Sequence, residues 1–159
     1  MGLQDDVTEE EADLGGGKVL RGHPEAIRSF VAARDLARER NRRWPQRPNG
    51  SVDTRAAMTT LARSFPTLRD AADGVEPFEV ERFARWLCSG AGGGGAIRAG
   101  RFVLHVWNPN ADHRELGREL GLEAADGCLA PFNVSDALGV WNEEHRRAFL
   151  AWCEAPFWP

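Results

Sequence analysis

Residues 96–107 read AIRAGRFVLHVW, and the structure of this stretch decides the fold class of the chain. Its second half, 102–107, has the aromatic and β-branched composition of a strand. Ala96, Gly100 and Val103 nevertheless recur at helical spacing. No second convincing strand is found elsewhere in the sequence, and an isolated strand leaves its backbone groups without partners. We therefore predict a helix over 96–107 and an all-α fold.

Helical patterns lie on both sides of this stretch. A proline in the first turn or a polar N-cap residue marks each start, and apolar residues spaced three or four apart mark a buried face. The predicted helices cover 24–43, 53–65, 77–90, 113–120, 133–140 and 143–154. We expect an irregular bundle of five or six helices, with the densest core in 78–159, where aromatic residues concentrate.

The N-terminal residues differ in composition from the rest of the chain. Residues 1–13 hold six acidic residues and no basic one, and three glycines follow at 15–17. Such a segment cannot offset the entropy of ordering by burying apolar surface. We predict a flexible acidic and glycine-rich tail over 1–22 and a single helical domain over 23–159.

The same composition bears on location. An acidic start is unlike the basic start of a signal peptide, and no stretch approaches the ~20 apolar residues of a membrane span. Cys88, Cys128 and Cys153 are widely spaced and fit neither a disulfide framework nor a Cys-x-x-Cys metal site. We expect a cytoplasmic protein without a membrane partner, in which the three cysteines are small buried hydrophobic residues.

The sharpest local signal is an arginine-rich stretch at the end of the first predicted helix. Its members are Arg34, Arg38, Arg40, Arg42, Arg43 and Arg47, with Trp44 among them. The guanidinium groups could contact phosphates while the indole stacks on a base, or they could bind an acidic protein. Cations in a last helical turn also complement the helix dipole, and the acidic tail could neutralise them within the chain. Because the net charge is −4, nucleic-acid binding would have to be local to this stretch.

Metal and catalytic sites are weakly signalled. His105, Asp112 and His113 lie close together in sequence, and His145 could join them, but their spacing matches no established metal site. Asp112 is better explained as an N-cap. No motif pairs a nucleophile with a base, although Cys128 or Cys153 with His145 is a pair that the fold could bring together. We predict no catalytic residue and no bound metal.

Glycines at 90 and 92–95 precede the helix of 96–107, and a glycine-rich helix N-terminus can bind phosphate. Arg98 would be the natural phosphate partner. A P-loop would continue with Gly-Lys-Ser/Thr, whereas Ala96 and Ile97 follow here. We expect a flexible connector, with no nucleotide and no other cofactor.

The chain ends in Phe157, Trp158 and Pro159, and such an apolar end is costly to leave in water unless it docks on a core or a partner. We predict that Phe157 and Trp158 are interface residues. Tryptophan is also a common core residue. At least three of the following five are expected to be buried: Trp86, Trp107, Trp141, Trp152 and Trp158.

Two stretches, 101–109 (RFVLHVWNP) and 137–146 (ALGVWNEEHR), together with the aromatic and proline ending, resemble a pattern in an uncharacterised family of small high-GC bacterial proteins. The resemblance covers about the last 80 residues. It implies a recurring module and carries no known activity, cofactor or catalytic residue.

Aromatic surface and segregated charge are present, while catalytic motifs are absent. We therefore predict a non-catalytic protein-interaction module, an adaptor or accessory subunit of a larger bacterial assembly. The alternative is a nucleic-acid-binding accessory protein that uses the arginine-rich segment 24–47. A metal- or thiol-dependent enzyme is the second alternative.

Overall fold

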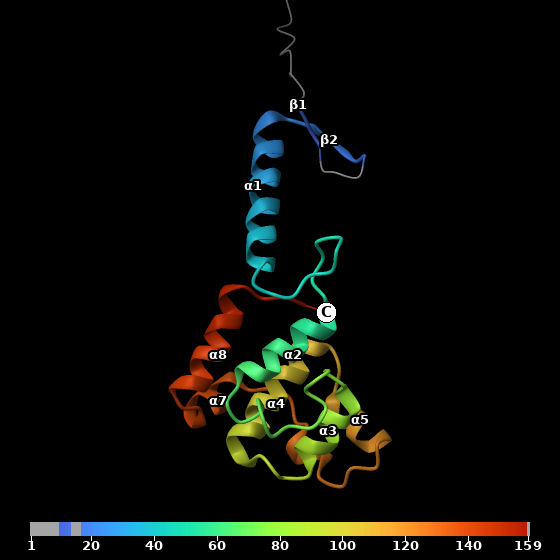
Figure 1. Cartoon of the computed structure of the whole chain (residues 1–159), viewed down its shortest axis with the longest axis vertical. Helices are drawn as coiled ribbons and strands as arrows, with labels where there is room; N and C mark the ends of the chain where they lie inside the picture. The colour runs from blue at the N-terminus through green and yellow to red at the C-terminus, as the bar shows by residue number, and fades with distance from the viewer. Residues whose placement is uncertain (1–9, 14–16, 159) are drawn as a thin grey trace, which may run out of the picture. The chain divides into compact units, whose positions relative to one another are not determined.

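A computed structural model describes residues 10–13 and 17–158 of the chain (Figure 1). These residues are mostly helical, as predicted, but a small antiparallel sheet is also present. The elements are β1 (Glu10–Asp13), β2 (Val19–Gly22), α1 (Pro24–Asn41), α2 (Thr54–Ser64), α3 (Val80–Cys88), α4 (Gly93–Trp107), α5 (His113–Glu119), α6 (Ala125–Cys128), α7 (Val134–Val140) and α8 (Glu143–Glu154).

The chain divides into two compact units, and the single helical domain predicted over 23–159 spans parts of both. The N-terminal unit covers residues 1–40 and the C-terminal unit covers 41–159. The boundary falls at the end of α1, so the predicted arginine-rich stretch is shared between the two units. Among the described residues, no helix is both long and apolar enough to cross a bilayer.

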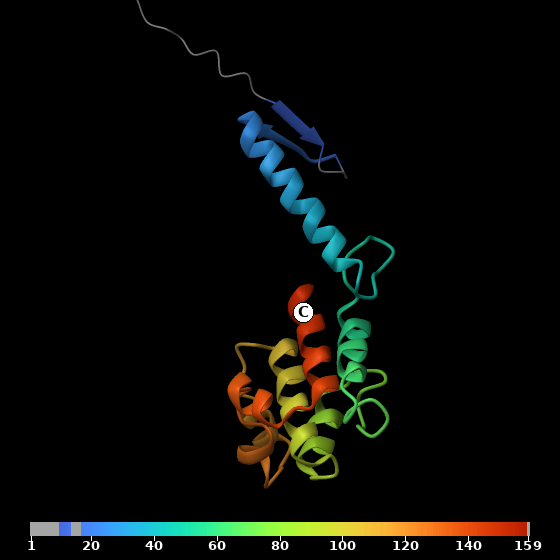
Figure 2. The ribbon, with the colours of Figure 1, turned by 90° about the vertical axis from the view of Figure 1, so that its left-hand side faces the viewer.

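The N-terminal unit combines a hairpin with α1. β1 and β2 pair antiparallel, with Ala12 opposite Leu20, and both of these side chains are half-buried. In Figures 1 and 2 the hairpin lies beside the N-terminal half of α1. Residues 10–13 and 19–22 thus form strands where a flexible tail was predicted, because the two segments pair with each other and satisfy each other's backbone groups. The rest of the predicted tail, 1–9 and 14–16, lies outside the described residues.

The C-terminal unit is built around α4, which packs against α2, α3 and α7 (Figure 2). The helix predicted over 96–107 is confirmed and begins slightly earlier, at Gly93. Phe102 is its central core residue, since its ring lies 5.1 to 5.7 Å from the rings of Phe65, Phe132, Phe149 and Trp152. The core extends beyond the predicted 78–159, because α2 also buries an apolar face.

Polar N-caps fix the starts of four of these helices. The side chains of Asp53, Asp112, Asn133 and Asn142 each accept a hydrogen bond from a backbone N–H of the first turn of α2, α5, α7 and α8. All four were predicted as caps, and such bonds satisfy N–H groups that the helix itself leaves unpaired. The four-residue α6 was not predicted.

Candidate interaction surface

α1 buries little of its own surface. Among the described residues of the N-terminal unit, Ile27 is the one buried apolar side chain, with 4% of its surface exposed. Val31 and Arg34, which lie on the same face of the helix, are half-buried. The face of α1 that carries Ile27, Val31 and Arg34 is therefore the one covered by the rest of the N-terminal unit.

A second apolar stripe runs along α1 and lies open to solvent. We define the α1 stripe as Ala26, Phe30, Ala33, Leu36 and Ala37, all of which are exposed. Phe30 exposes 47% of its surface and Leu36 exposes 58%. Four of the five residues follow one another at intervals of four, three and four, which places them on one face, and Leu36 borders that face. Phe30 shares the apolar spacing that predicted the helix over 24–43, but spacing alone does not distinguish a buried face from an uncovered one.

The predicted arginines have different environments. Arg38 and Arg40 lie exposed on the last turns of α1. Arg34 instead turns toward its own unit, where its guanidinium group lies 3.1 Å from a carboxylate oxygen of Asp35 and donates to the carbonyl oxygen of Asp13 at 3.4 Å. Arg38 and Arg40 are thus open to solvent, whereas Arg34 is held within its own unit.

The other predicted arginines belong to the C-terminal unit. Arg42 and Arg47 are exposed there. Arg43 forms an ion pair with Glu154 at 3.1 Å. The six arginines therefore have different environments, with three of them in each unit.

Trp44 is not a surface stacking residue, so this prediction is wrong. Its side chain is 7% exposed, and its indole N–H donates to the carbonyl oxygen of Ala155 at 2.6 Å. Its ring lies 4.6 Å from that of Phe157. The apolar chain end thus docks on its own core, and in that position Trp44 cannot stack on a nucleic-acid base.

The two residues predicted at an interface differ from each other. Phe157 is buried against Trp44 and is not available to a partner. Trp158 is 53% exposed and makes edge contacts with Trp152 and His105. Of the five tryptophans considered for the core, Trp141 and Trp152 are buried, whereas at least three were expected.

The weak metal candidates are not brought together in one site. Among the described residues, no group of three or more His, Cys, Asp or Glu is placed to hold a metal ion. Asp112 caps α5 and binds the guanidinium of Arg114 through both carboxylate oxygens, at 2.8 and 2.7 Å. These hydrogen bonds lower the pKa of Asp112 to about 2. Its charge is therefore already matched by an arginine.

The histidines are mainly structural. The ring nitrogens of His145 lie 2.9 Å from the hydroxyl of Thr67 and 2.7 Å from the side-chain oxygen of Asn142, so this histidine joins α8 to the loop after α2. His113 is also buried, and neither of its ring nitrogens has a hydrogen-bond partner. Burial lowers the pKa of both rings. His105 is half-buried and lies beside Phe132 and Trp158.

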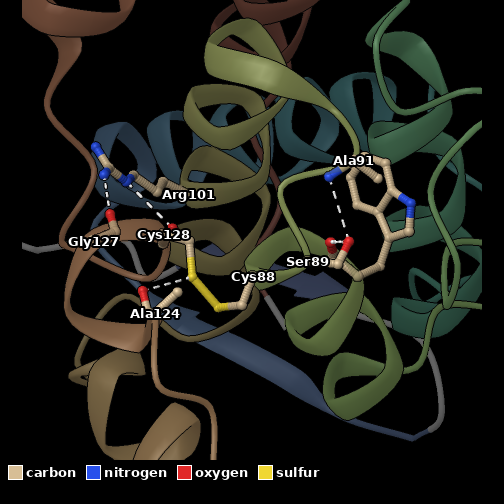
Figure 3. The surroundings of a disulfide bond; sticks show 8 residues. Cys88, Ser89, Ala91, Arg101, Ala124, Gly127 and Cys128 are labelled. Carbon is tan, nitrogen blue, oxygen red and sulfur yellow. Dashed lines mark hydrogen bonds between the residues drawn. A yellow bond between two sulfur atoms is a disulfide. The ribbon is translucent and has the colours of Figure 1, made fainter.

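The cysteine prediction is wrong. Cys88 at the end of α3 and Cys128 at the end of α6 form a disulfide, with their Cα atoms 5.4 Å apart (Figure 3). Arg101 of α4 donates hydrogen bonds to the backbone carbonyls of Gly127 and Cys128 and so holds the end of α6 in place. Sequence spacing gave no signal for this bond, because α6 itself was not predicted.

The disulfide also changes the chemistry open to the cysteines. Cys128 has no free thiol, and Cys153 is exposed rather than buried. Partial desolvation of the Cys153 thiol nevertheless raises its pKa, which keeps this thiol protonated near neutral pH. Disulfides persist mainly in oxidising compartments, and the cytoplasmic location stays a prediction.

The glycine-rich segment serves helix packing. A Cβ atom on Gly92 would lie 2.6 Å from the Trp86 ring and 2.4 Å from the Ala96 side chain, so glycine lets α3 and α4 approach each other. Arg98, the predicted phosphate partner, donates to Gly94 at 3.1 Å and to Asp136 at 2.8 Å. Its guanidinium group is thus already bound within the protein.

Two open hollows lie beside α2 in the C-terminal unit. Their volumes are about 480 and 620 Å³, and Thr59, Thr60 and Glu76 line both. Glu76 forms an ion pair with Arg63 at this side of α2.

No family model, curated protein or solved structure matches the chain. A function must therefore be argued from the surface of the chain itself. The candidate interaction surface is the α1 stripe together with the exposed Arg38 and Arg40.

Proposed function

We propose that the protein is a non-catalytic interaction module whose α1 stripe binds a partner protein. The single observation that carries this proposal is the exposure of Phe30 and Leu36 on a helix whose other face is covered. Burying a side chain of this size is worth about 1.5–3 kcal/mol. Two such residues, six positions apart on α1, provide a driving force for association.

The stability of α1 supports the same proposal. Helices in proteins gain most of their stability from packing an amphipathic face against other elements. α1 has 18 residues but buries only Ile27 among its apolar side chains. A partner that covers the α1 stripe would supply the missing packing.

Charge defines the kind of partner. Arg38 and Arg40 are exposed at the end of α1, where they also complement the negative end of the helix dipole. A complementary surface would be an apolar groove or helix face bordered by carboxylates. A protein that binds such a partner would act as an adaptor or accessory subunit of a larger assembly.

Nucleic acid remains the second candidate, because Arg38, Arg40, Arg42 and Arg47 are exposed. Two observations favour a protein instead. The burial of Trp44 removes the predicted stacking platform. A phosphate backbone also offers no apolar surface to cover Phe30 and Leu36.

Affinity purification of the tagged full-length protein from its native host tests the proposal. A variant carrying Phe30→Glu and Leu36→Glu should lose the proteins that co-purify with the wild type. The matched control is Leu150→Glu, because Leu150 is 56% exposed but lies on α8. The control should keep these proteins, and circular dichroism should show both variants folded. Equal retention by the α1 variant and the control would contradict the proposal, and nuclease-sensitive co-purification that depends on Arg38 and Arg40 would favour nucleic acid.

A further inference from the structure

We infer that the partner of the α1 stripe is the α1 stripe of a second copy of this chain, paired antiparallel. The inference rests on the proposed function and names its partner. Three features of α1 lead to it: the period of the exposed residues, their symmetry along the helix, and the charge at the two ends of the N-terminal unit.

The exposed residues of α1 are spaced as in two helices that pack along each other. We call Ala26, Phe30, Ala33 and Ala37 the seam. Ala26, Phe30, Ala33 and Ala37 follow at intervals of four, three and four residues, the alternation that defines the a and d positions of a heptad. This spacing keeps one stripe facing a partner helix along its whole length. Three of the four residues are alanine, whose small side chain lets two helix backbones approach closely.

The order of residues in the seam is self-complementary. Its midpoint falls between Val31 and Ala32, so Phe30 and Ala33 are equally distant from it, as are Ala26 and Ala37. In an antiparallel pair each Phe30 would lie opposite Ala33 of the second copy, so that a large residue fills the space beside a small one. In a parallel pair Phe30 would face Phe30, and Ala33 would face Ala33, which leaves the layers unevenly filled. An antiparallel pair is also a two-fold interface, the commonest symmetry of protein assemblies.

Charge favours the same orientation. Glu10 lies on the hairpin beside the N-terminal half of α1, where Glu11 is already paired with Arg21, and Glu25 lies in the first turn of α1. Arg38 and Arg40 lie at the opposite end of the helix. Antiparallel pairing sets the basic end of each copy near the acidic end of the other, whereas parallel pairing sets like charges together. The hairpin thus supplies the carboxylates expected of the partner.

The seam is short, so the pair should be weak. Interfaces below ~1,200 Å² of total buried area belong to transient complexes. We expect a reversible monomer–dimer equilibrium whose position depends on protein concentration.

Sedimentation equilibrium of the purified full-length protein tests the inference. The wild type and Leu150→Glu should show the same reversible dimerisation, whereas Phe30→Glu should be monomeric. A monomeric wild type up to ~1 mM, or a dimer unaffected by Phe30→Glu, would overturn the inference. If the wild type is monomeric but Phe30→Glu and Leu36→Glu still abolish co-purification, the proposed function stands with a different protein as partner.

Cysteine cross-linking tests the orientation. In a Cys153→Ser background, which removes the exposed free thiol, Ala26→Cys and Ala37→Cys would each be prepared separately. An antiparallel pair should cross-link when the two variants are mixed, and neither variant should cross-link alone. Cross-linking of each variant with itself would indicate a parallel pair and contradict the orientation inferred here.

Discussion

His113 and His145 are buried as neutral rings, and burial lowers the pKa of both below the ordinary value of 6.5. A group that binds protons more weakly when folded than when unfolded favours unfolding as it is protonated. Their contribution to stability should therefore be complete above about pH 6.5 and be lost as the pH falls toward the lowered values. Asp112, with a pKa of about 2, loses its charge only in much stronger acid.

We predict that the melting temperature of the protein decreases as the pH is lowered from 7 to 5. The substitution His113→Leu should flatten this dependence, because neither ring nitrogen of His113 has a partner to lose. His145 is less suitable for this test, since its replacement also removes the hydrogen bonds to Thr67 and Asn142. Thermal denaturation measured across this pH range tests the prediction. If the melting temperature of His113→Leu changes with pH in parallel with that of the wild type, His113 is not the source of the pH dependence.

Residues whose roles are local were predictable, and residues whose roles depend on distant contacts were not. The caps at Asp53, Asp112 and Asn142 act within one helical turn, so sequence alone identified them. Trp44 donates its hydrogen bond to a residue 111 positions away, and no local pattern reveals that contact. The exposure of Phe30 is equally non-local, because it depends on which face of α1 another element covers.

At the scale of elements, the helices of seven or more residues were predicted, and the four-residue α6 and the hairpin were not. α4 carries enough apolar residues to set its period, whereas α6 has four residues and no clear period. The hairpin was missed because acidic and glycine-rich residues surround its few apolar ones. The unpredicted α6 also hid the disulfide, which joins it to α3.

This disulfide closes a loop of 40 residues, for which the entropy of the unfolded chain predicts a stabilisation of about 4 kcal/mol. We predict that the oxidised protein, unfolded without reductant, has one titratable thiol, that of Cys153, and that full reduction gives three. Urea unfolding with and without reductant measures the stability difference, and Cys153→Ser serves as the control that leaves the disulfide intact. Three titratable thiols in the oxidised protein would contradict the bond.

At the scale of the whole molecule, the buried core belongs to one unit. Every residue of the main hydrophobic cluster among the described residues lies between Trp44 and Phe157, inside the C-terminal unit. We predict that a chain of residues 41–159 folds alone, with a melting temperature close to that of the full-length protein. Its near-ultraviolet circular dichroism should keep the signal of the packed tryptophans, and loss of that signal would show that the C-terminal unit needs the N-terminal unit to fold.

The central claim is that another protein covers the α1 stripe, and site-specific photo-cross-linking in the native host tests it most directly. A photoreactive phenylalanine analogue would replace Leu36 in one variant and, as the control, Leu150 in another, since both side chains are about equally exposed. We predict an adduct of defined mass at position 36 that disappears when Phe30→Glu is added, and no such adduct at position 150. An adduct of twice the chain mass would identify a second copy as the partner. No adduct at position 36, or the same adducts at both positions, would contradict the claim.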